Sequence, residues 1–439
     1  MIRRGPPRGF ALVWGSRQNL KMSPNPRQLC VRALLEWEKG TTFSDEILHA
    51  TLDRHSMPPQ DRALLMELFF GVLRRLRSLD FLMGQLRPQP VDVLTKNALR
   101  VGLYQIFYMR IPPHAAVFET VGVAPPRSRG LVNACLRRSV REIEALNAKL
   151  ASQPSPVRFS TQDFLWERWE KRFGSEGGAQ LCAVQNLPSE SFFRINRIKC
   201  SRITASEFSF SSGEGWSSDS HPDVIRVSQV PREELAAGLG YMQDPSTLLA
   251  PDLLDPQPGE RVLDACAAPG GKATYIAQKM GNCGDLIACE IFPSRAARLR
   301  ENVARLGASS VRVLQADFLT APEEGSPLLE SPFDRILLDV PCSNTGVIRR
   351  RVDVRWRLTE EDFIRMPVQQ MAFIRRAVPL LKPGGILVYS TCSIEPEENQ
   401  EVVRQALSEC SELRLEEERC VLPHTGGMDG AFAARFRRL

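Results

Sequence analysis

The chain lacks the sequence patterns of zinc sites, disulfide frameworks and membrane spans. Its eleven cysteines include no C-x-x-C pair, so a zinc site of the usual spacing is not expected. An odd number of cysteines in a chain of 439 residues also argues against a set of disulfides. No apolar run approaches the ~18 residues of a membrane span, and the N-terminus has no apolar segment of a secretory signal. We therefore expect a cytoplasmic protein with reduced cysteines, no metal and no membrane partner.

The charge of the chain tells more through its distribution than through its total. The chain has 57 Lys and Arg against 51 Asp and Glu, and a net charge of +6 only weakly suggests nucleic acid as a partner. Residues 22–155 carry 18 basic against 12 acidic side chains, whereas residues 244–439 carry 24 against 28. A composition of 43% hydrophobic and 25% charged residues excludes a disordered, collagen-like or coiled-coil chain. The length predicts about two to four domains, and the positive charge belongs to the N-terminal third.

Residues 1–22 form a basic tail that has two explanations. Residues 1–21 contain five basic side chains and no acidic one. The tail is either an arm for nucleic acid or a segment that is not translated because translation starts at Met22.

Residues 23–150 have the apolar periodicity of helices. One apolar face with the spacing i, i+3, i+4, i+7 is formed by Leu65, Leu68, Phe69, Val72, Leu76 and Leu79. Basic side chains at Arg74, Arg75 and Arg77 are predicted on the outer face of that helix. Shorter runs of the same kind, separated by proline pairs, occur at 29–37, 98–107 and 132–143. This part of the chain is predicted to be an all-α bundle.

Residues 151–243 predict a small mixed α/β segment. Phe192–Asn196 and Asp223–Val227 have the composition of short strands, and the Ser- and Gly-rich stretch Ser206–Ser220 predicts a loop.

From residue 244 onward, short apolar runs alternate with stretches of helix length. The predicted strands are Val262–Ala265, Leu286–Cys289, Val311–Leu314, Ile336–Leu338 and Ile386–Tyr389. Strands separated by helix-length crossovers predict a parallel, doubly wound α/β sheet of the Rossmann-like kind, with ligands at the carboxyl ends of the strands.

The first three strand ends carry groups suited to a nucleoside-containing cofactor. Cys266–Thr274 opens a helix with two glycines, which lets a ligand approach backbone N–H groups, although a plain tight turn is the common alternative. The stretch is neither a P-loop nor a G-x-G-x-x-G motif, so no phosphate cradle is predicted. Glu290 and Asp317 end the next two strands, where a carboxylate accepts hydrogen bonds from ribose hydroxyls.

The last two strand ends each carry a cysteine. Asp339–Ser343 follows one strand and Ser390–Ser393 follows the other. In a sheet of order 3-2-1-4-5 these strands are neighbours, ~4.8 Å apart, so Cys342 and Cys392 are predicted to face the same crevice, beside the cofactor. Two unrelated buried cysteines are the alternative.

These motifs resemble those of the RNA (cytosine-5) methyltransferases that use S-adenosylmethionine. The resemblance rests on Leu263–Thr274, Asp339–Ser343 and Ser390–Ser393, in this order and at these spacings. Further upstream, Leu99–Gln105, Ile111–Ala116 and Gly130–Arg137 resemble the NusB-like helical RNA-binding domain. Bacterial proteins of the Sun/Fmu (RsmB) type carry both domains, and the resemblance extends from residue 24 to the closing Gly426–Arg435.

The resemblance implies a role for each motif. It makes Cys392 the nucleophile that adds to C6 of cytosine, Cys342 the group that removes the C5 proton and releases the product, and Asp339 a contact of cytosine N3. The implied S-adenosylmethionine contacts are Cys266, Ala267, Ala268, Pro269, Gly270, Gly271, Lys272, Glu290, Asp317 and Asp339. The residues alone leave open which cysteine attacks. The implied domains are residues 23–150, NusB-like; 151–243, a linker or small RNA-binding domain; and 244–439, catalytic.

The sequence departs from the family pattern in a few positions and adds a basic cluster. Asn344 stands where a glycine is common, and Glu290 stands where an aspartate is more frequent. Phosphate contacts and base stacking are predicted for Arg349, Arg350, Arg351, Arg355, Arg357 and Trp356, with a solvated basic loop as the alternative.

The implied activity is methylation of a cytidine in ribosomal RNA, most simply of the small subunit, by a monomeric enzyme. The first alternative is a non-catalytic RNA-binding or ribosome-assembly factor with an inert methyltransferase fold. The second is a DNA cytosine-5 methyltransferase, which would leave Cys392 unexplained. The sequence does not identify the modified cytidine, nor whether naked RNA or an assembling particle is the substrate.

Overall fold

The computed structural model describes residues 25–201 and 221–439, which form two compact units. The first consists of the described part of Met1–Gly71 together with Pro90–Val140, and the second consists of Val72–Gln89 together with Arg141–Leu439. The basic tail at 1–22 and the predicted loop Ser206–Ser220 lie outside the described residues.

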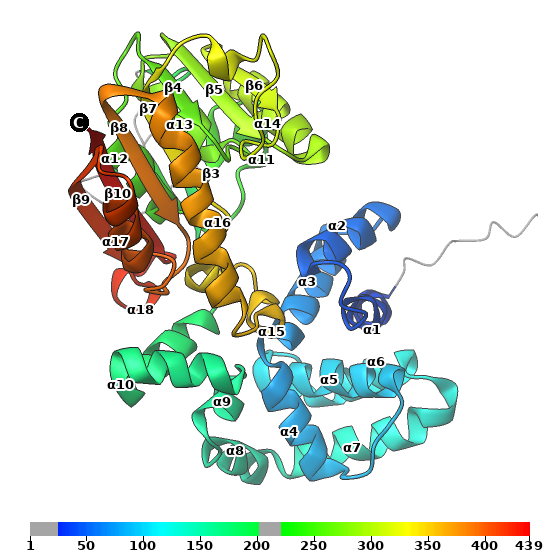
Figure 1. The fold of residues 1–439 in the computed structure, drawn as a ribbon. Coiled ribbons are helices and arrows are strands. Elements are labelled where there is room, and N and C mark those ends of the chain that lie inside the picture. The colour runs from blue at the N-terminus through cyan, green and yellow to red at the C-terminus, as the bar shows by residue number, and fades with distance from the viewer. Residues whose placement is uncertain (1–24, 202–220) are drawn as a thin grey trace, which may run out of the picture. The chain divides into compact units, whose positions relative to one another are not determined.

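The first unit is all helical, as predicted. Its helices are α1 (Pro26–Trp37), α2 (Ser44–Arg54), most of α3 (Pro59–Arg74), α5 (Val93–Tyr108), α6 (Pro113–Val123) and nearly all of α7 (Arg129–Arg141). Asn25 caps α1 by accepting the N–H of Arg27, and Asp92 caps α5 by accepting the N–H of Thr95. Helix α5 is buried along almost its whole length and forms the centre of the unit (Figure 1).

The predicted single helix through Leu65 and Leu79 is wrong, because the chain breaks at Arg75. Helix α3 ends at Arg74, Arg75 has a non-helical ψ of 16°, and α4 (Leu76–Leu86) follows. The predicted basic outer face is also wrong for two of its residues. Arg74 is buried, and Arg77 donates hydrogen bonds to the carbonyl oxygen of Thr161 and to Asp163. The hydrogen bonds of Arg77 join α4 to the segment that precedes and begins α10, in the same unit.

The middle of the chain forms helices and a small antiparallel sheet. The helices are α8 (Ile143–Ala151), α9 (Ser155–Arg158), α10 (Asp163–Gln185) and α11 (Arg232–Ala236). The sheet has the order β2 (Val224–Val227), β1 (Ser191–Ile195), β3 (Gly240–Met242). The two predicted strands are therefore present, and the segment is the mixed α/β one that was expected.

The last part of the chain is built on a seven-stranded sheet of order β6-β5-β4-β7-β8-β10-β9. Its five predicted strands are parallel: β4 (Arg261–Asp264), β5 (Asp285–Glu290), β6 (Val311–Gln315), β7 (Phe333–Asp339) and β8 (Leu381–Thr391). Two further strands, β9 (Leu413–Val421) and β10 (Ala431–Arg438), extend the sheet with antiparallel pairing. The helices are α12 (Leu249–Leu254), α13 (Gly271–Lys279), α14 (Pro293–Leu306), α15 (Val354–Arg357), α16 (Asp362–Ala377), α17 (Gln400–Glu409) and α18 (Pro423–Gly426).

Alternate residues of the central strands face two different hydrophobic layers. Leu263 and Ile336 pack in the layer that contains α16 and α17, whereas Val262 and Leu337 pack in the layer that contains α12 and α13 (Figure 1). Both faces of the strands are therefore buried, which explains why the strands are continuous apolar runs. The predicted doubly wound fold is confirmed, and the carboxyl ends of β4 to β8 meet at one edge of the sheet. No helix of the described residues is long and apolar enough to cross a membrane.

Candidate active site

The first strand end carries the predicted glycine-rich loop. After β4, the loop Ala265–Gly270 leads directly into α13, and the Ala268–Pro269 peptide bond is cis. Gly270 has a φ of 109°, and a Cβ atom there would lie 2.8 Å from Cδ1 of Leu299. The positive φ favours glycine at this position, where the chain turns into the N-terminus of α13.

Glu290 and Asp317 lie at the ends of the next two strands. Glu290 is buried, its Oε1 accepts the N–H of Phe292 at 3.0 Å, and its Oε2 lies 3.6 Å from Nε of Arg295. Asp317 is half-buried and accepts the N–H of Leu319 at 2.9 Å. Both carboxylates order the turn that follows them and keep further lone pairs for a ligand.

Asp264 is a site residue that the sequence analysis missed. It ends β4, is fully buried, and its Oδ2 has no hydrogen-bond partner among the described residues. Burial, followed by the charge of Asp339, raises the pKa of Asp264 to about 7, although Lys272 acts in the opposite direction. The sequence contained a signal for Asp264, because an acidic residue ends the apolar strand directly before the glycine loop.

Lys272 and Asp339 join the glycine loop to the first cysteine motif. Nζ of Lys272 lies 2.7 Å from Oδ2 of Asp339, and Ser390 donates a hydrogen bond of 2.9 Å to Oδ1. Burial acts to lower the pKa of Lys272, but the charge and hydrogen bond of Asp339 outweigh burial and raise that pKa. Asp339 is therefore held from both sides beside the ends of β7 and β8.

The two cysteines meet as the predicted strand order requires. The Sγ atoms of Cys342 and Cys392 are 3.2 Å apart; Cys342 is buried and Cys392 is half-buried. The hydrogen bond with Cys392, then burial and the charge of Glu398, raise the pKa of Cys342 well above its usual value. Cys342 is therefore a thiol at neutral pH, and Cys392 is the more accessible sulfur.

Glu398 is a second residue that the sequence analysis missed. Its buried carboxylate accepts the N–H of Ser343 and Nε2 of Gln370, both at 2.9 Å, and the hydroxyl of Ser393 at 2.6 Å. Because Ser343 follows Cys342 and Ser393 follows Cys392, one carboxylate fixes both cysteine turns. A charged residue five positions after the Ser390–Ser393 motif did not by itself indicate this contact.

The residue that precedes β10 contacts the turn that follows Cys342 through its backbone. Gly430, which immediately precedes β10, donates its N–H to the carbonyl oxygen of Gly346 at 2.8 Å. Gly346 in turn donates its N–H to the carbonyl oxygen of Cys392 at 2.9 Å. A Cβ atom on Gly346 would lie 2.6 Å from the Cys392 carbonyl oxygen, so the three backbone segments touch directly.

The predicted RNA-binding arginines do not all lie at the surface. Arg355 is 1% exposed, donates to the carbonyl oxygens of Ser160 and Gln185, and has a pKa that burial lowers to about 9. Arg349 is also buried and forms an ion pair of 2.5 Å with Asp429. These two arginines have interior partners and, in this structure, offer no surface to a phosphate.

The rest of the cluster is more accessible. Arg351 is exposed, whereas Arg350 and Arg357 are half-buried and paired with carboxylates. Nε1 of Trp356 donates to the carbonyl oxygen of Leu73 at 2.8 Å, and its ring is half-buried. Contact with RNA stays a prediction for these four residues.

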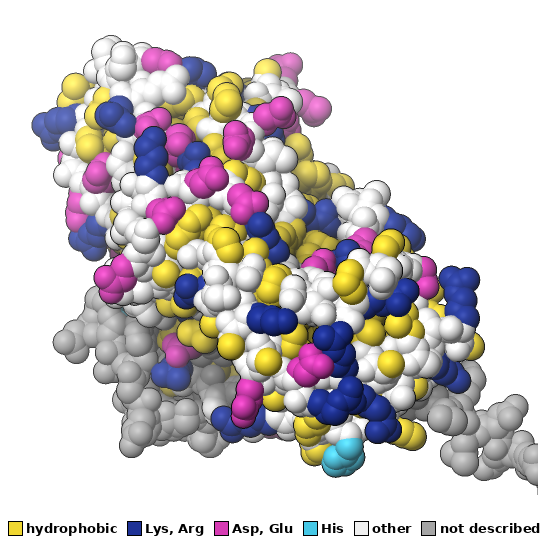
Figure 2. Space-filling view, turned by 90° about the horizontal axis from the view of Figure 1, so that it is seen from below, with side chains coloured by type: hydrophobic (Ala, Val, Ile, Leu, Met, Phe, Trp, Pro, Cys, Tyr) yellow, Lys and Arg dark blue, Asp and Glu magenta, His cyan; other side chains and the backbone are white. Residues whose placement is uncertain are grey.

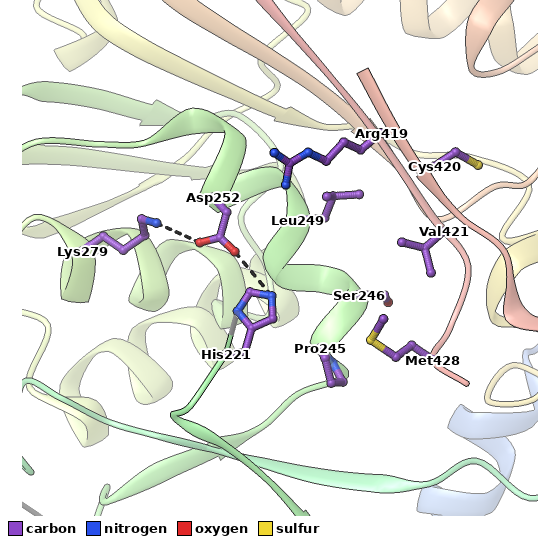
Figure 3. Close-up of a pocket in the computed structure, with 10 residues that line it drawn as sticks. All are labelled: His221, Pro245, Ser246, Leu249, Asp252, Lys279, Arg419, Cys420, Val421 and Met428. Carbon is purple, nitrogen blue, oxygen red and sulfur yellow. Dashed lines mark hydrogen bonds and ion pairs between the residues drawn. The ribbon is translucent and has the colours of Figure 1, made fainter. Parts of the chain in front are cut away.

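The described residues also form an open pocket of about 690 Å³. It is lined by His221, Pro245, Ser246, Leu249, Asp252, Lys279, Arg419, Cys420, Val421 and Met428. Figure 3 shows Asp252 between Lys279, at 2.8 Å, and His221, at 3.6 Å. None of the residues predicted as site residues lines this pocket.

The mostly parallel sheet, its glycine loop and the ligand edge define a Rossmann-like methyltransferase domain, which follows the helical region in the chain. Comparison with known proteins identifies the family. The family described as 16S rRNA methyltransferase RsmB/F matches residues 251–437, and the NusB family matches residues 24–141. The chain belongs to the RsmB/F family, with a NusB domain ahead of its methyltransferase domain.

Individual relatives match almost the whole chain. The ribosomal RNA small subunit methyltransferase B of Yersinia enterocolitica is 38% identical, over 95% of this chain and 99% of its own length. The probable ribosomal RNA small subunit methyltransferase B of Bacillus subtilis is 31% identical, over 94% and 98%. Among solved structures, a methyltransferase homolog protein from Pyrococcus horikoshii is 29% identical, with a TM-score of 0.54, over 65% of this chain and 98% of its own.

Proposed function

We propose that this protein transfers a methyl group from S-adenosylmethionine to C5 of a cytidine in small-subunit (16S) ribosomal RNA. The reaction proceeds through a covalent bond between Cys392 and C6 of the base. The observation that carries the proposal is the pair of thiols 3.2 Å apart, beside the ion pair of Lys272 and Asp339. The names of the curated relatives support ribosomal RNA of the small subunit as the substrate.

The residues at the first three strand ends fit S-adenosylmethionine. The buried Oδ2 of Asp264, which has no partner among the described residues, is an acceptor that a bound ligand can satisfy, and the start of α13 offers backbone N–H groups beside it. Glu290 accepts hydrogen bonds from ribose hydroxyls, and the loop Cys266–Lys272 and Asp317 bound the rest of the site. When bound, S-adenosylmethionine supplies a methyl group activated by its positively charged sulfur.

Cys392 activates the cytosine for this transfer. C5 of cytosine is a weak nucleophile, so the Cys392 thiolate first forms a bond to C6, and the electron pair of the C5=C6 bond moves to C5. Asp339 lies at the cytosine edge and favours a protonated N3, which withdraws electrons from C6 and promotes the attack. Lys272 and Ser390 hold the Asp339 carboxylate in place for this contact.

Cys342 completes the reaction once the methyl group is on C5. Cys342 first loses its own proton to water. Its thiolate then takes the C5 proton, the electron pair of the C5–H bond re-forms the C5=C6 bond, and the C6–S bond breaks to return the thiolate of Cys392. The hydrogen bond with Cys392 is the largest cause of the raised pKa of Cys342. Since the sulfur of Cys392 is bonded to C6 at this stage, that cause is weakened and Cys342 becomes easier to deprotonate.

The RNA reaches the two cysteines through an unstacked nucleotide. A base inside a duplex cannot be attacked at C6, so the target cytidine is single-stranded or flipped out. We propose phosphate and base contacts for Arg350, Arg351, Trp356 and Arg357, and a supporting RNA surface on the basic helical unit. Figure 2 shows lysine and arginine side chains among hydrophobic and acidic ones on one face of the molecule.

The test is methyl transfer from labelled S-adenosylmethionine to unmodified 16S ribosomal RNA, with nucleoside analysis of the product. We expect label in 5-methylcytidine, and we expect unlabelled RNA but not DNA to compete. No incorporation into RNA, naked or in small-subunit particles, would favour the RNA-binding factor with an inert fold. Incorporation into DNA alone would favour the DNA methyltransferase. Bisulfite sequencing of RNA from a deletion strain then identifies the cytidine.

A further inference from the structure

Asn344 contacts both cysteine motifs through its side chain. It lies two residues after Cys342, in the left-handed region with a φ of 60°. Its Nδ2 donates to the carbonyl oxygen of Cys342 at 2.7 Å, and its Oδ1 accepts from Sγ of Cys392 at 3.2 Å. Asparagine tolerates the left-handed region better than most residues, so it brings a polar side chain to a place where glycine would bring none.

These two contacts determine the direction of the thiol hydrogens. A carbonyl oxygen only accepts, so the amide nitrogen of Asn344 must face Cys342 and the amide oxygen must face Cys392. An amide oxygen only accepts as well, so the one hydrogen of the Cys392 thiol is used on Asn344. The donor in the 3.2 Å contact between the sulfurs is then Cys342.

We propose that Asn344 is a positioning residue that orders these hydrogen bonds from Cys342 to Cys392 to Asn344 and thereby aims the Cys392 sulfur. The proposal rests on the proposed function where it takes Cys392 as the attacking sulfur. The order of the hydrogen bonds has a direct consequence for the reaction. The S–H of Cys342 already points at Cys392, so it can stabilise the thiolate that forms before attack and again on release.

The test uses two substitutions of Asn344 that remove the same hydrogen-bond donor but differ in whether an acceptor for the Cys392 thiol is kept. Asn344→Gly and Asn344→Asp both remove the donor to the Cys342 carbonyl oxygen, and both residues tolerate the left-handed backbone. Asn344→Gly also removes the acceptor of the Cys392 hydrogen, whereas Asn344→Asp replaces that acceptor with a carboxylate, which accepts more strongly. The readout is the rate of alkylation of Cys392 by iodoacetamide in the full chain at pH 7.5, followed for each cysteine by peptide mass spectrometry.

We expect opposite changes in the two variants. Alkylation of Cys392 rises about fivefold in Asn344→Gly, because one hydrogen bond that holds the thiol is lost, and it falls by a similar factor in Asn344→Asp. Methyl transfer falls in both variants through kcat, with KM for RNA changed less than about twofold, because alkylation accepts any approach to the sulfur whereas attack at C6 needs one direction. Changes of alkylation in the same direction, or none, would overturn the proposal. Since alkylation needs neither cofactor nor RNA, its result is independent of whether the proposed reaction is right.

Discussion

The two halves of the ligand edge satisfy their buried polar groups in different ways. At the ends of β4 to β6, Asp264 is buried with an oxygen that has no hydrogen-bond partner among the described residues. At the ends of β7 and β8, the Glu398 carboxylate accepts three hydrogen bonds and ties both cysteine turns together. The first half is therefore incomplete without a ligand, whereas in the second half hydrogen bonds within the chain already order the two cysteine turns. A binding site needs polar groups that are free to contact a ligand, whereas a site that forms bonds needs side chains that are already held in place. Neighbouring parts of one sheet meet these two needs here.

The largest expected effect is on methyl transfer, and it differs between variants of the two cysteines in the ordered half. Cys392→Ala should lower methyl transfer at least about a thousandfold and abolish covalent protein–RNA species, because the attacking sulfur is gone. Cys342→Ala should still attack but fail to release, so a covalent species should accumulate on denaturing gels. If only Cys392→Ala accumulated this species, the two roles would be reversed.

The incomplete half should make the ligand-free protein sensitive to pH. The pKa of Asp264 is raised to about 7 in the folded protein, against about 3.9 in an unfolded chain, so the folded state binds the proton more tightly. The free energy of unfolding should therefore fall as pH rises from about 4 to about 7, by on the order of 3 kcal/mol.

Asp264→Asn should remove most of that fall, because the asparagine does not ionise. Urea unfolding at pH 5 and pH 8 measures it, and Asp317→Asn, which changes a half-buried carboxylate with a backbone partner, is the control. An equal fall in the Asp264→Asn protein would mean that other groups cause the pH dependence.

The ordered half should lose stability when its central acceptor is changed. Glu398→Gln brings an NH₂ group to a site that three donors occupy, and we expect a loss of about 2–3 kcal/mol in the free energy of unfolding. At the neighbouring Glu397, one oxygen pairs with Arg168 and the other is buried without a partner among the described residues, so Glu397→Gln should cost less than about 1 kcal/mol. Similar unfolding midpoints for the two variants would show that Glu398 does not hold the turns.

The smallest effect concerns the arginines after the Cys342 motif. Arg351→Ala should weaken RNA binding about threefold and reduce the slope of log affinity against log salt by about one, because one phosphate contact is lost. Its thermal midpoint should not change, since the side chain is exposed. Arg355→Ala is the matched contrast, and it should lower the thermal midpoint because three interior hydrogen bonds are lost. If the Arg351→Ala protein binds RNA with the affinity of the unchanged protein, Arg351 does not contact RNA and the arginines form a solvated basic loop, as in the alternative prediction.

The sequence predicted the parts of the fold that depend on local pattern. The five parallel strands and the helical N-terminal part follow from apolar runs and periodicity, and the strand order brings Cys342 and Cys392 together. The break at Arg75 was not predictable in this way, because the apolar face continues through it and the contacts that hold α4 come from residues about 80 positions later.

The roles of charged side chains were harder to predict than those of apolar ones. Arg355 and Arg351 are four residues apart in one basic run, yet one is buried against Ser160 and Gln185 and the other is exposed. Glu398 likewise has the sequence context of a solvated acid. Which charge is buried depends on partners that only the folded chain brings together.

The contact between Gly430 and Gly346 has a consequence for the order in which the site forms during synthesis. The Cys342 and Cys392 turns are complete in sequence well before Gly430 and β10, which inserts between β8 and β9, are made. While the ribosome still holds β10, the sheet is open at that position and the backbone of the Cys392 turn lacks its outer support. The outer support of the Cys392 turn is therefore the last part of this arrangement to form, after β10 has left the ribosome.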